Sequence, residues 1–291
     1  MKLAICLFGN VGISTDASNR NSTNLLKESE QASTDPQICY EGIRKNFLEK
    51  YETDVFIHSW SVNYKSKLEN LYKPKSFIFE KQIMFKTKLE DYGINNKKQI
   101  SEWKVSSDTQ KSYELLLPSR GSVENVVKDL QKLSFRAKSR WYSTKKVIEL
   151  MSDYSRINHI QYDFVLLSRI DCLFQESINL SKLDKNKFYA SKRIGREDEN
   201  LALYDFFFLS DQKNMTKFSK LYKNISNYSI RPPFASMQHA KNEFGEKNIN
   251  HILDYNIDYD KVRVPEKSRL KFSNKIINFI KRIITRVFLN K

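Results

Sequence analysis

Three short apolar runs, each ending in polar or charged residues, constrain the fold of this chain most strongly. The runs with the residues that follow them are Leu3–Phe8 with Gly9-Asn10, Val55–Ile57 (preceded by Asp54) with His58-Ser59-Trp60, and Phe164–Leu167 with Ser168-Arg169-Ile170-Asp171. Continuous apolar runs this short are typical of strands that are buried on both faces, as in parallel sheets. A helical pattern over residues 37–50 separates the first two runs. The order strand, helix, strand predicts an α/β fold with a sheet flanked by helices.

Further periodic segments extend this pattern to about residue 255. The spacing predicts helices over 139–157, 213–222 and 235–244, and strands over 76–80 and 202–209. Residues 12–36 are rich in Ser, Thr, Asn and Asp and predict a surface loop. We therefore expect one folded domain over residues 1–265, followed by a separate segment over residues 266–291.

The composition excludes several classes of protein. A chain of 291 residues with 40% hydrophobic content can bury one sizeable core, and its 7 Gly and 6 Pro argue against fibrous or low-complexity chains. Cys6, Cys39 and Cys172 are scattered singly, which fits a reducing compartment. No apolar stretch approaches the roughly 20 residues that span a bilayer. We expect a cytoplasmic protein that is soluble or peripheral to a membrane.

The net charge is concentrated at one end of the chain. Lys+Arg 50 against Asp+Glu 34 gives +16, and residues 267–291 carry eight cations and no acid. An excess of this size implies an anionic partner. A nucleic-acid-binding protein is one alternative, but it would need cations along a groove with stacking aromatic residues. Here the aromatic residues lie mostly in apolar runs, so we do not expect a nucleic-acid partner.

The basic tail has two distinct helical faces. The apolar residues fall at positions 276, 277, 280, 283, 284, 287 and 288, and the polar face between them is basic. This pattern predicts an amphipathic helix that lies on an anionic membrane surface. A terminal helix packed on the core is the alternative. The first interpretation places the protein at the inner face of the membrane.

The carboxyl ends of the predicted strands are the first place to look for a site, because ligands of open α/β sheets bind there. At the third strand end, Arg169 can pair with a phosphate oxygen, and Asp171 can hold a divalent cation that bridges two phosphates. A surface ion pair is the alternative interpretation. At the first strand end, Gly9 and Asn10 predict a ligand-binding loop. At the second, His58 and Trp60 either flank a ligand or belong to the core.

The order of these motifs resembles that of a known family. The chain carries an apolar strand into Gly9, then Asp54–Trp60, then Ser139-Arg140-Trp141-Tyr142-Ser143, then Tyr162–Asp171. These residues resemble bacterial and viral polysaccharide-biosynthesis glycosyltransferases of the glycosyltransferase-A type. The resemblance implies a Rossmann-like nucleotide-binding half and an acceptor-binding half around one mixed sheet. It also implies transfer of a monosaccharide from a nucleotide-diphosphate sugar to a glycan or lipid-linked acceptor, in surface polysaccharide or lipopolysaccharide synthesis.

The same resemblance bears on the cofactor. Asp171 stands where the family's metal-binding Asp-x-Asp motif ends, which implies Mn²⁺ or Mg²⁺ as cofactor. Arg169 replaces the first aspartate, so the sequence leaves the metal dependence open, and it also leaves open an inactive transferase-like protein that binds only glycans or partner proteins. Because a strand-end carboxylate contributes little packing, Asp171→Ala is expected to leave the fold intact.

The remaining candidate residues concern the acceptor. Glycosyl transfer with inversion needs a carboxylate that takes the acceptor's proton. Asp205, a charge inside an apolar strand, is one candidate, with a water-facing residue on an edge strand as the alternative. Glu243 on a later helix competes with it, with an exposed helical carboxylate as the alternative. Ser139 and Ser143 share one helical face and could hydrogen-bond a substrate, although Ser143 could also be an internal N-cap.

Other enzyme classes lack their motifs in this sequence. The histidines and cysteines show no ligand spacing for zinc, and neither Gly-x-x-x-x-Gly-Lys nor Gly-x-Gly-x-x-Gly occurs. Kinases that use a P-loop and dinucleotide oxidoreductases are therefore not favoured.

Overall fold

The computed structural model describes residues 1–13, 32–34, 36–85, 123–192, 202–255, 257–261 and 264–265. Its centre is a seven-stranded sheet with the order β10-β8-β9-β6-β1-β4-β5. These strands are β1 Lys2–Gly9, β4 Glu52–Ser59, β5 Ser76–Phe79, β6 Phe164–Arg169, β8 Phe188–Lys192, β9 Tyr204–Ser210 and β10 Ile249–Asp254. β1, β4, β5 and β6 are parallel, and β9 runs antiparallel to both of its neighbours.

This mixed sheet, flanked by helices, confirms the predicted fold class and is consistent with the glycosyltransferase-A-like fold that the resemblance implied. The α-helices are α2 Pro36–Ile43, α3 Lys65–Tyr72, α7 Val123–Ile157, α8 Gln212–Phe218 and α9 Pro232–Phe244. α2 continues as a π-helix over Arg44–Leu48. Short 3-10 helices cover Val62–Tyr64, Leu180–Lys182, Ser219–Tyr222, Ile225–Asn227 and Glu246–Asn248.

Small additional strands pair outside the main sheet. β7 Cys172–Phe174 pairs with β11 Tyr259–Lys261, and β3 Ala32–Thr34 pairs with β2 Gly12–Ile13 and β12 Val264–Pro265. β7 begins directly after Asp171, so its pairing with β11 fixes the chain that follows this candidate site residue.

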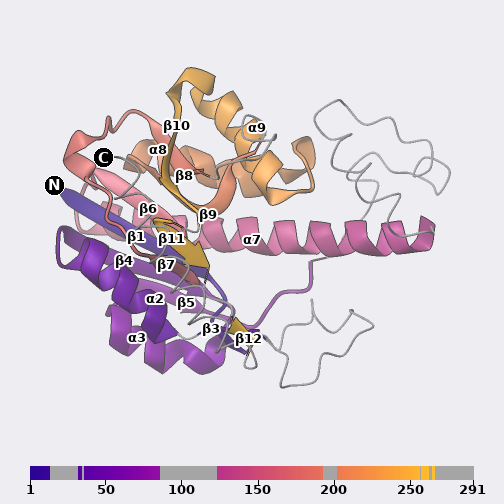
Figure 1. Ribbon diagram of the computed structural model, residues 1–291, viewed down its shortest axis with the longest axis horizontal. Helices are drawn as coiled ribbons and strands as arrows, with labels where there is room; N and C mark the ends of the chain where they lie inside the picture. The colour runs from indigo at the N-terminus through magenta and orange to yellow at the C-terminus, as the bar shows by residue number, and fades with distance from the viewer. Residues whose placement is uncertain are drawn as a thin grey trace, which may run out of the picture.

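The helices form a layer on each face of the sheet (Figure 1). Alternate residues of the central strands point to opposite faces, which is the expected period of a strand. In β1, Cys6 and Phe8 face the layer of α7, α8 and α9, while Ile5 and Leu7 face the layer of α2 and α3. The continuous apolar run at the start of the chain therefore supplies both cores at once.

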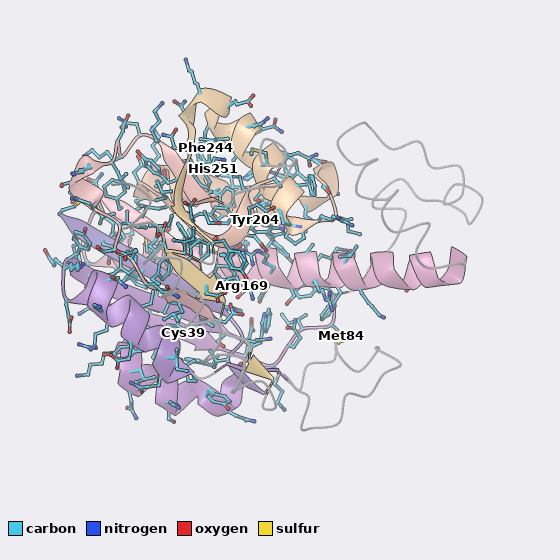
Figure 2. The ribbon with its side chains drawn as sticks, in the orientation of Figure 1. Cys39, Met84, Arg169, Tyr204, Phe244 and His251 are labelled. Carbon is cyan, nitrogen blue, oxygen red and sulfur yellow. The ribbon has the colours of Figure 1, made fainter. Side chains whose placement is uncertain are left out.

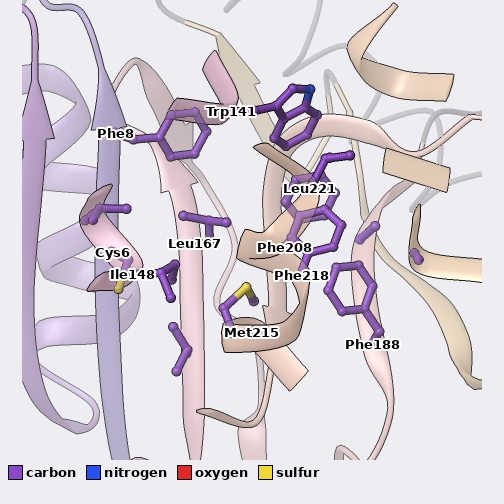
Figure 3. Close-up of a cluster of buried hydrophobic side chains, with 14 of the residues drawn as sticks. Cys6, Phe8, Trp141, Ile148, Leu167, Phe188, Phe208, Met215, Phe218 and Leu221 are labelled. Carbon is purple, nitrogen blue, oxygen red and sulfur yellow. The ribbon is translucent and has the colours of Figure 1, made fainter. Parts of the chain in front are cut away.

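The first core is rich in aromatic rings. Phe218 of α8 packs against Phe188 at 4.7 Å and Phe208 at 4.7 Å between ring centroids, and Trp141 of α7 contacts it at 6.0 Å (Figure 3). Burying side chains of this size stabilises a fold by about 1.5–3 kcal/mol each. This packing holds α7 and α8 against the strands that carry the site residues.

A glycine allows close packing in the second core. A Cβ atom on Gly42 would lie 2.7 Å from the backbone oxygen of Phe174 and 2.8 Å from Cδ1 of Leu173. The amide of Asn46, in the π-helical turn that follows, donates to the same oxygen of Phe174 at 2.9 Å. α2 can therefore pack directly on β7, which begins beside the candidate site.

Several predicted elements differ from the structure in their extent. The helix expected over 139–157 begins at Val123 instead, and Figure 1 shows it projecting beyond the sheet. β8 and β10 were not predicted, because their segments mix polar residues with apolar ones. Asp205 is not on an edge strand, since β9 lies between β8 and β6.

The proposed division at residue 265 lies at the end of the described residues. The expected amphipathic helix over 266–291 lies outside them. Within the part of the chain that the structure describes, no helix is both long enough and apolar enough to cross a membrane.

Candidate functional site

The carboxyl ends of the parallel strands meet at one edge of the sheet. β1 ends at Gly9, β4 at Ser59 and β6 at Arg169. β9 runs in the opposite direction, and Ser168 pairs with its Phe207, so its first residues, including Asp205, lie at the same edge. Figure 2 labels Arg169 at this edge, beyond which the first part of α7 projects away from the sheet. The topology thus brings Asp205 to the predicted site.

Arg169 and Asp171 form a two-pronged ion pair. Nε of Arg169 donates to Oδ1 of Asp171 at 2.7 Å, and Nη2 donates to Oδ2 at 2.5 Å. The side chains are 16% and 3% exposed. Burial acts to lower the pKa of Arg169, but the charge and hydrogen bonds of Asp171, with the charge of Asp205, outweigh it and raise that pKa. Arg169 is therefore a permanent cation in the site.

The buried position of Asp171 changes the expectation for Asp171→Ala. Asp171 is 2% exposed, and both of its carboxylate oxygens bind the guanidinium. Removing it would leave a buried, uncompensated arginine, which typically costs about 3–5 kcal/mol. Asp171 is therefore not the cleft-facing carboxylate with little packing that we expected, and Asp171→Ala should destabilise the fold. The ion pair is mostly buried, in contrast to the surface ion pair of the alternative interpretation.

Arg140 and Asp205 form a second ion pair. Nη1 of Arg140 lies 2.9 Å from Oδ2 of Asp205, and Nη2 donates to the backbone oxygen of Asp205. The guanidinium also lies over the rings of Phe8 at 4.7 Å and Trp141 at 5.0 Å. Burial lowers the pKa of Arg140 to about 10, against the opposing effect of Asp205. At neutral pH this side chain is still a cation.

One donor of Arg140 remains unused. Its Nε atom is buried and has no hydrogen-bond partner among the described residues. A buried donor without an acceptor costs about 1–3 kcal/mol. Nε of Arg140 therefore has the capacity to donate one further hydrogen bond.

The two ion pairs act on one another electrostatically. Arg169 acts to lower the pKa of Arg140, and Asp171 acts to raise it. Asp205 in turn acts to raise the pKa of Arg169. Two cations and two anions therefore share one small, mostly buried region at the carboxyl edge. We call these four side chains the charge cluster.

The charge cluster does not fit the divalent cation that the resemblance implied. Both oxygens of Asp171, the candidate metal ligand, are engaged by Arg169. Among the described residues, no group of three or more His, Cys, Asp or Glu side chains is placed to hold a metal ion. Hard cations such as Mg²⁺ and Mn²⁺ need several oxygen ligands. The described residues of the charge cluster do not supply such a set of oxygens.

The loop after β1 begins with a glycine in a positive-φ conformation. Gly9 has φ +111°, a backbone conformation that other residues rarely adopt. Oγ of Ser59 donates to the backbone oxygen of Gly9 at 2.8 Å, and the amide of Val11 donates to Oγ of Ser61 at 3.0 Å. These bonds fix the turn around Asn10 at the same edge as the charge cluster.

His58 is part of a buried hydrogen-bonded chain. Its Nδ1 lies 2.6 Å from Oγ of Ser143, and its Nε2 lies 2.9 Å from Oε1 of Glu80. The ring is fully buried, and burial lowers the pKa of His58 despite the opposing charge of Glu80. The interpretation as a hydrogen-bonded core histidine therefore describes His58, and Ser143 binds His58 rather than capping a helix.

The other predicted residues of this region are also engaged with protein groups. Trp60 stacks on Tyr142 with 5.4 Å between centroids, and Oγ of Ser139 donates to Oε1 of Gln82 at 3.1 Å. The nearby carboxylate of Glu80 keeps 31% of its side chain exposed. Of the three hydrogen-bonded residues Ser143, His58 and Glu80, Glu80 is the one that solvent or a ligand can reach.

Glu243 is not brought to the charge cluster. It lies at the far end of α9, next to Phe244, which stacks on Phe188 at the start of β8. The first turn of α9, by contrast, accepts a hydrogen bond from the backbone of Leu203, beside the start of β9. Asp205 and Glu243 thus lie toward opposite ends of the sheet.

Two polar residues of the site were missed from the sequence. Arg140 falls on the inward face of α7, three residues after Ala137 and four before Thr144, both of which are buried. A cation on an otherwise buried helical face was the available signal. Glu80 had a weaker signal, as a carboxylate directly after an apolar strand.

Comparisons with known proteins do not identify the chain. No family model matches it, and no curated protein matches it. The fold is similar to that of a solved structure from Desulfovibrio desulfuricans G20, a protein named provisionally as a nucleotide-diphospho-sugar transferase. The similarity has a TM-score of 0.41 and 6% sequence identity, and it covers 96% of this chain and 97% of that chain. A likeness this distant establishes neither the family nor the activity.

Proposed function

We infer that this protein is a glycosyltransferase that moves a monosaccharide from a nucleotide-diphosphate sugar to a glycan or lipid-linked acceptor. The observation that supports this proposal is the charge cluster at the carboxyl edge of the sheet. It combines two guanidinium groups, which suit phosphate oxygens, with a carboxylate that is only 16% exposed. The guanidinium groups can bind the diphosphate, and the carboxylate can take the acceptor's proton.

The donor's diphosphate would bind to Arg140 and Arg169. The unused Nε–H of Arg140 supplies a donor that no described protein group satisfies. Guanidinium groups next to the diphosphate stabilise the negative charge that grows on it as it departs. Gly9 and Asn10 line the same edge and provide the turn around which the donor would lie.

Asp205 would act as the base. The oxygen of the acceptor hydroxyl forms a bond to the anomeric carbon while its proton passes to a carboxylate oxygen of Asp205. The bond from the anomeric carbon to the phosphate oxygen breaks, and its electron pair leaves with the diphosphate. Binding of the diphosphate would draw Arg140 away from Asp205 and so free the carboxylate for the acceptor.

The basic tail supports a location for this reaction. An amphipathic helix over residues 266–291 would hold the enzyme at the inner face of a membrane, where lipid-linked acceptors reside. We propose surface polysaccharide or lipopolysaccharide synthesis as the process that it serves.

A panel of nucleotide sugars tests the proposed function. UDP-glucose, UDP-galactose, UDP-N-acetylglucosamine, GDP-mannose and dTDP-glucose are added separately while thermal unfolding and release of nucleoside diphosphate are measured. A ligand present at 100 times its Kd stabilises the folded state by about 2.7 kcal/mol, which is a readily measured rise in Tm. Stabilisation without release would indicate an inactive binding protein. If millimolar donors change neither quantity, the assignment as a transferase is wrong.

A further inference from the structure

The charge cluster differs from a metal-assisted diphosphate site in one specific way. A carboxylate that holds Mn²⁺ or Mg²⁺ must present its oxygens to the ion. In this protein the oxygens of Asp171 accept at 2.7 Å and 2.5 Å from Arg169, two residues earlier in the chain. The side chain of Asp171 is only 3% exposed, so the space next to its oxygens is filled by the guanidinium.

Asp171 accepts hydrogen bonds from only some of the N–H donors of Arg169. Arg169 uses Nε and Nη2 toward Asp171, which leaves Nη1 for another acceptor. Arg140 is nine-tenths buried and has an unused Nε–H. Arg140 and Arg169 thus each have an N–H group that can donate to a further acceptor, and both lie in the same mostly buried region.

The position and charge of Arg169 also suit it to serve as the cation that balances a bound diphosphate. Arg169 lies at the end of β6, held by the ladder from Val165 to Ser168, and its guanidinium lies 5.5 Å from the ring centroid of Phe206. A guanidinium that already makes a two-pronged ion pair has less rotamer freedom left to lose when a ligand binds. A divalent ion would have to enter next to two arginines and displace one of them, at a large electrostatic cost.

We propose that Arg140 and Arg169 form a diphosphate-binding site that works without a divalent cation. The guanidinium of Arg169 fills the position next to the Asp171 oxygens that a metal ion would need. This inference rests on the proposed function for its biological meaning. It makes an independent physical statement, namely that the site selects a diphosphate anion and rejects Mn²⁺ as long as Arg169 is present.

The test uses inorganic pyrophosphate and Mn²⁺ as separate probes of the full-length protein. Calorimetric titration in EDTA is expected to show pyrophosphate binding, and added Mg²⁺ should not tighten this binding, because Mg²⁺ only competes for pyrophosphate in solution. Arg169→Ala is expected to weaken binding about tenfold or more, and Arg169→Lys should weaken it less, since lysine keeps the charge and loses the fork. Arg156→Ala is the matched control, because Arg156 also pairs with an aspartate on α7 but is 74% exposed at the helix end.

The second arm measures Mn²⁺ alone by electron paramagnetic resonance. The wild-type protein should show no Mn²⁺ site that depends on Asp171 at concentrations up to about 1 mM, the weak end of protein cation sites. Arg169→Asp should create such a site, because it frees Asp171 and adds a second carboxylate. Adding Asp171→Asn to that variant should abolish it. Circular dichroism verifies that each variant is folded, and Arg169→Lys provides the comparison if Arg169→Ala is not.

Three results would overturn the inference. They are a wild-type Mn²⁺ site that Asp171→Asn removes, pyrophosphate binding that requires a divalent ion, and pyrophosphate binding that Arg169→Ala leaves unchanged. The proposed function is tested separately by the nucleotide sugars. If pyrophosphate binds without metal but no nucleotide sugar does, the transferase assignment fails and the cation-free anion site stands.

Discussion

Nε2 of His58 lies 2.9 Å from Oε1 of Glu80, which joins the buried end of β4 to a carboxylate that solvent can reach. A carboxylate accepts, so Nε2 carries the proton. Nδ1 is then the acceptor for the hydroxyl of Ser143, 2.6 Å away. The ring is neutral in this arrangement, and its two nitrogens connect β4, the residue after β5, and α7.

The buried histidines predict a loss of stability in mild acid. Burial lowers the pKa of both His58 and His239 in the folded protein. The unfolded chain therefore binds more protons as the pH falls below about 6.5, the ordinary histidine value. The stabilising contribution of neutral histidine is complete above that pH and is lost as the pH falls through the lowered pKa of the folded state. We expect Tm to decrease between neutral pH and about pH 5.

Variants assign this pH dependence to particular rings. His58→Gln lowers Tm at neutral pH but should make Tm less dependent on pH, because one titrating group is gone. His251→Gln is the control, since His251 is exposed at β10. Equal slopes of Tm against pH in the wild type and His58→Gln would show that His58 does not contribute.

The pair of Arg140 and Asp205 predicts a large coupling energy. Asp205→Ala leaves a buried guanidinium without its carboxylate and should lower the free energy of unfolding by about 3–5 kcal/mol. Replacing both residues by leucine should cost much less than the sum of the single changes. Urea unfolding measures each value. Asp153→Ala, which breaks an exposed pair with Arg156, should cost less than about 1 kcal/mol.

The two candidate bases can be separated by isosteric variants. Asp205→Asn keeps a hydrogen-bond acceptor for Arg140 but cannot take a proton, so turnover should fall by about 10²–10⁴ while donor binding persists. Glu243→Gln, far along α9, should leave turnover unchanged. Steady-state rates and donor Kd are measured for both. Unchanged turnover in Asp205→Asn with a loss in Glu243→Gln would reverse the assignment.

The tail predicts binding to anionic membranes. Truncation after Glu266 should abolish sedimentation with phosphatidylglycerol vesicles and leave nucleotide-sugar binding intact. Each removed cation contributes on the order of 1 kcal/mol near such a surface. High salt should weaken binding of the full chain without eliminating it, because burial of isoleucine and phenylalanine persists. Equal sedimentation of both proteins would contradict the membrane anchor.

The sequence predicted the parts of the fold that depend on local pattern. Leu3–Phe8 and Phe164–Leu167 are continuously apolar, and both became central strands buried on two faces. The strand ends that follow them met at one edge, since parallel strands place their carboxyl ends together. β10 was missed because its residues are half-exposed, and an edge strand needs no continuous apolar run.

The site depended more on long-range contacts. Arg169 and Asp171 are close in sequence, yet nothing local states that they bind one another rather than a ligand. Arg140 meets Asp205 across 65 residues, and His58 meets Ser143 across 85. Such pairs follow from how α7 packs on the sheet, which residue spacing alone does not specify. The role of Ser143 could therefore not be separated from capping until the packing was known.

A single turn of helix α7 contacts both the charge cluster and the buried His58. Arg140 contacts Asp205, and Ser143, three residues later, contacts His58, a separation of about 4.5 Å along a helix axis. Tyr142 lies between them in the same turn, so we expect a ligand that moves the side chain of Arg140 to disturb the packing of Tyr142 as well. Tyr142 stacks on Trp60, whose indole emission is sensitive to its neighbours. Trp141, whose ring lies 5.0 Å from the guanidinium of Arg140, is a second of the chain's three tryptophans. We therefore expect indole emission to change when a ligand occupies the arginine site, without an added label.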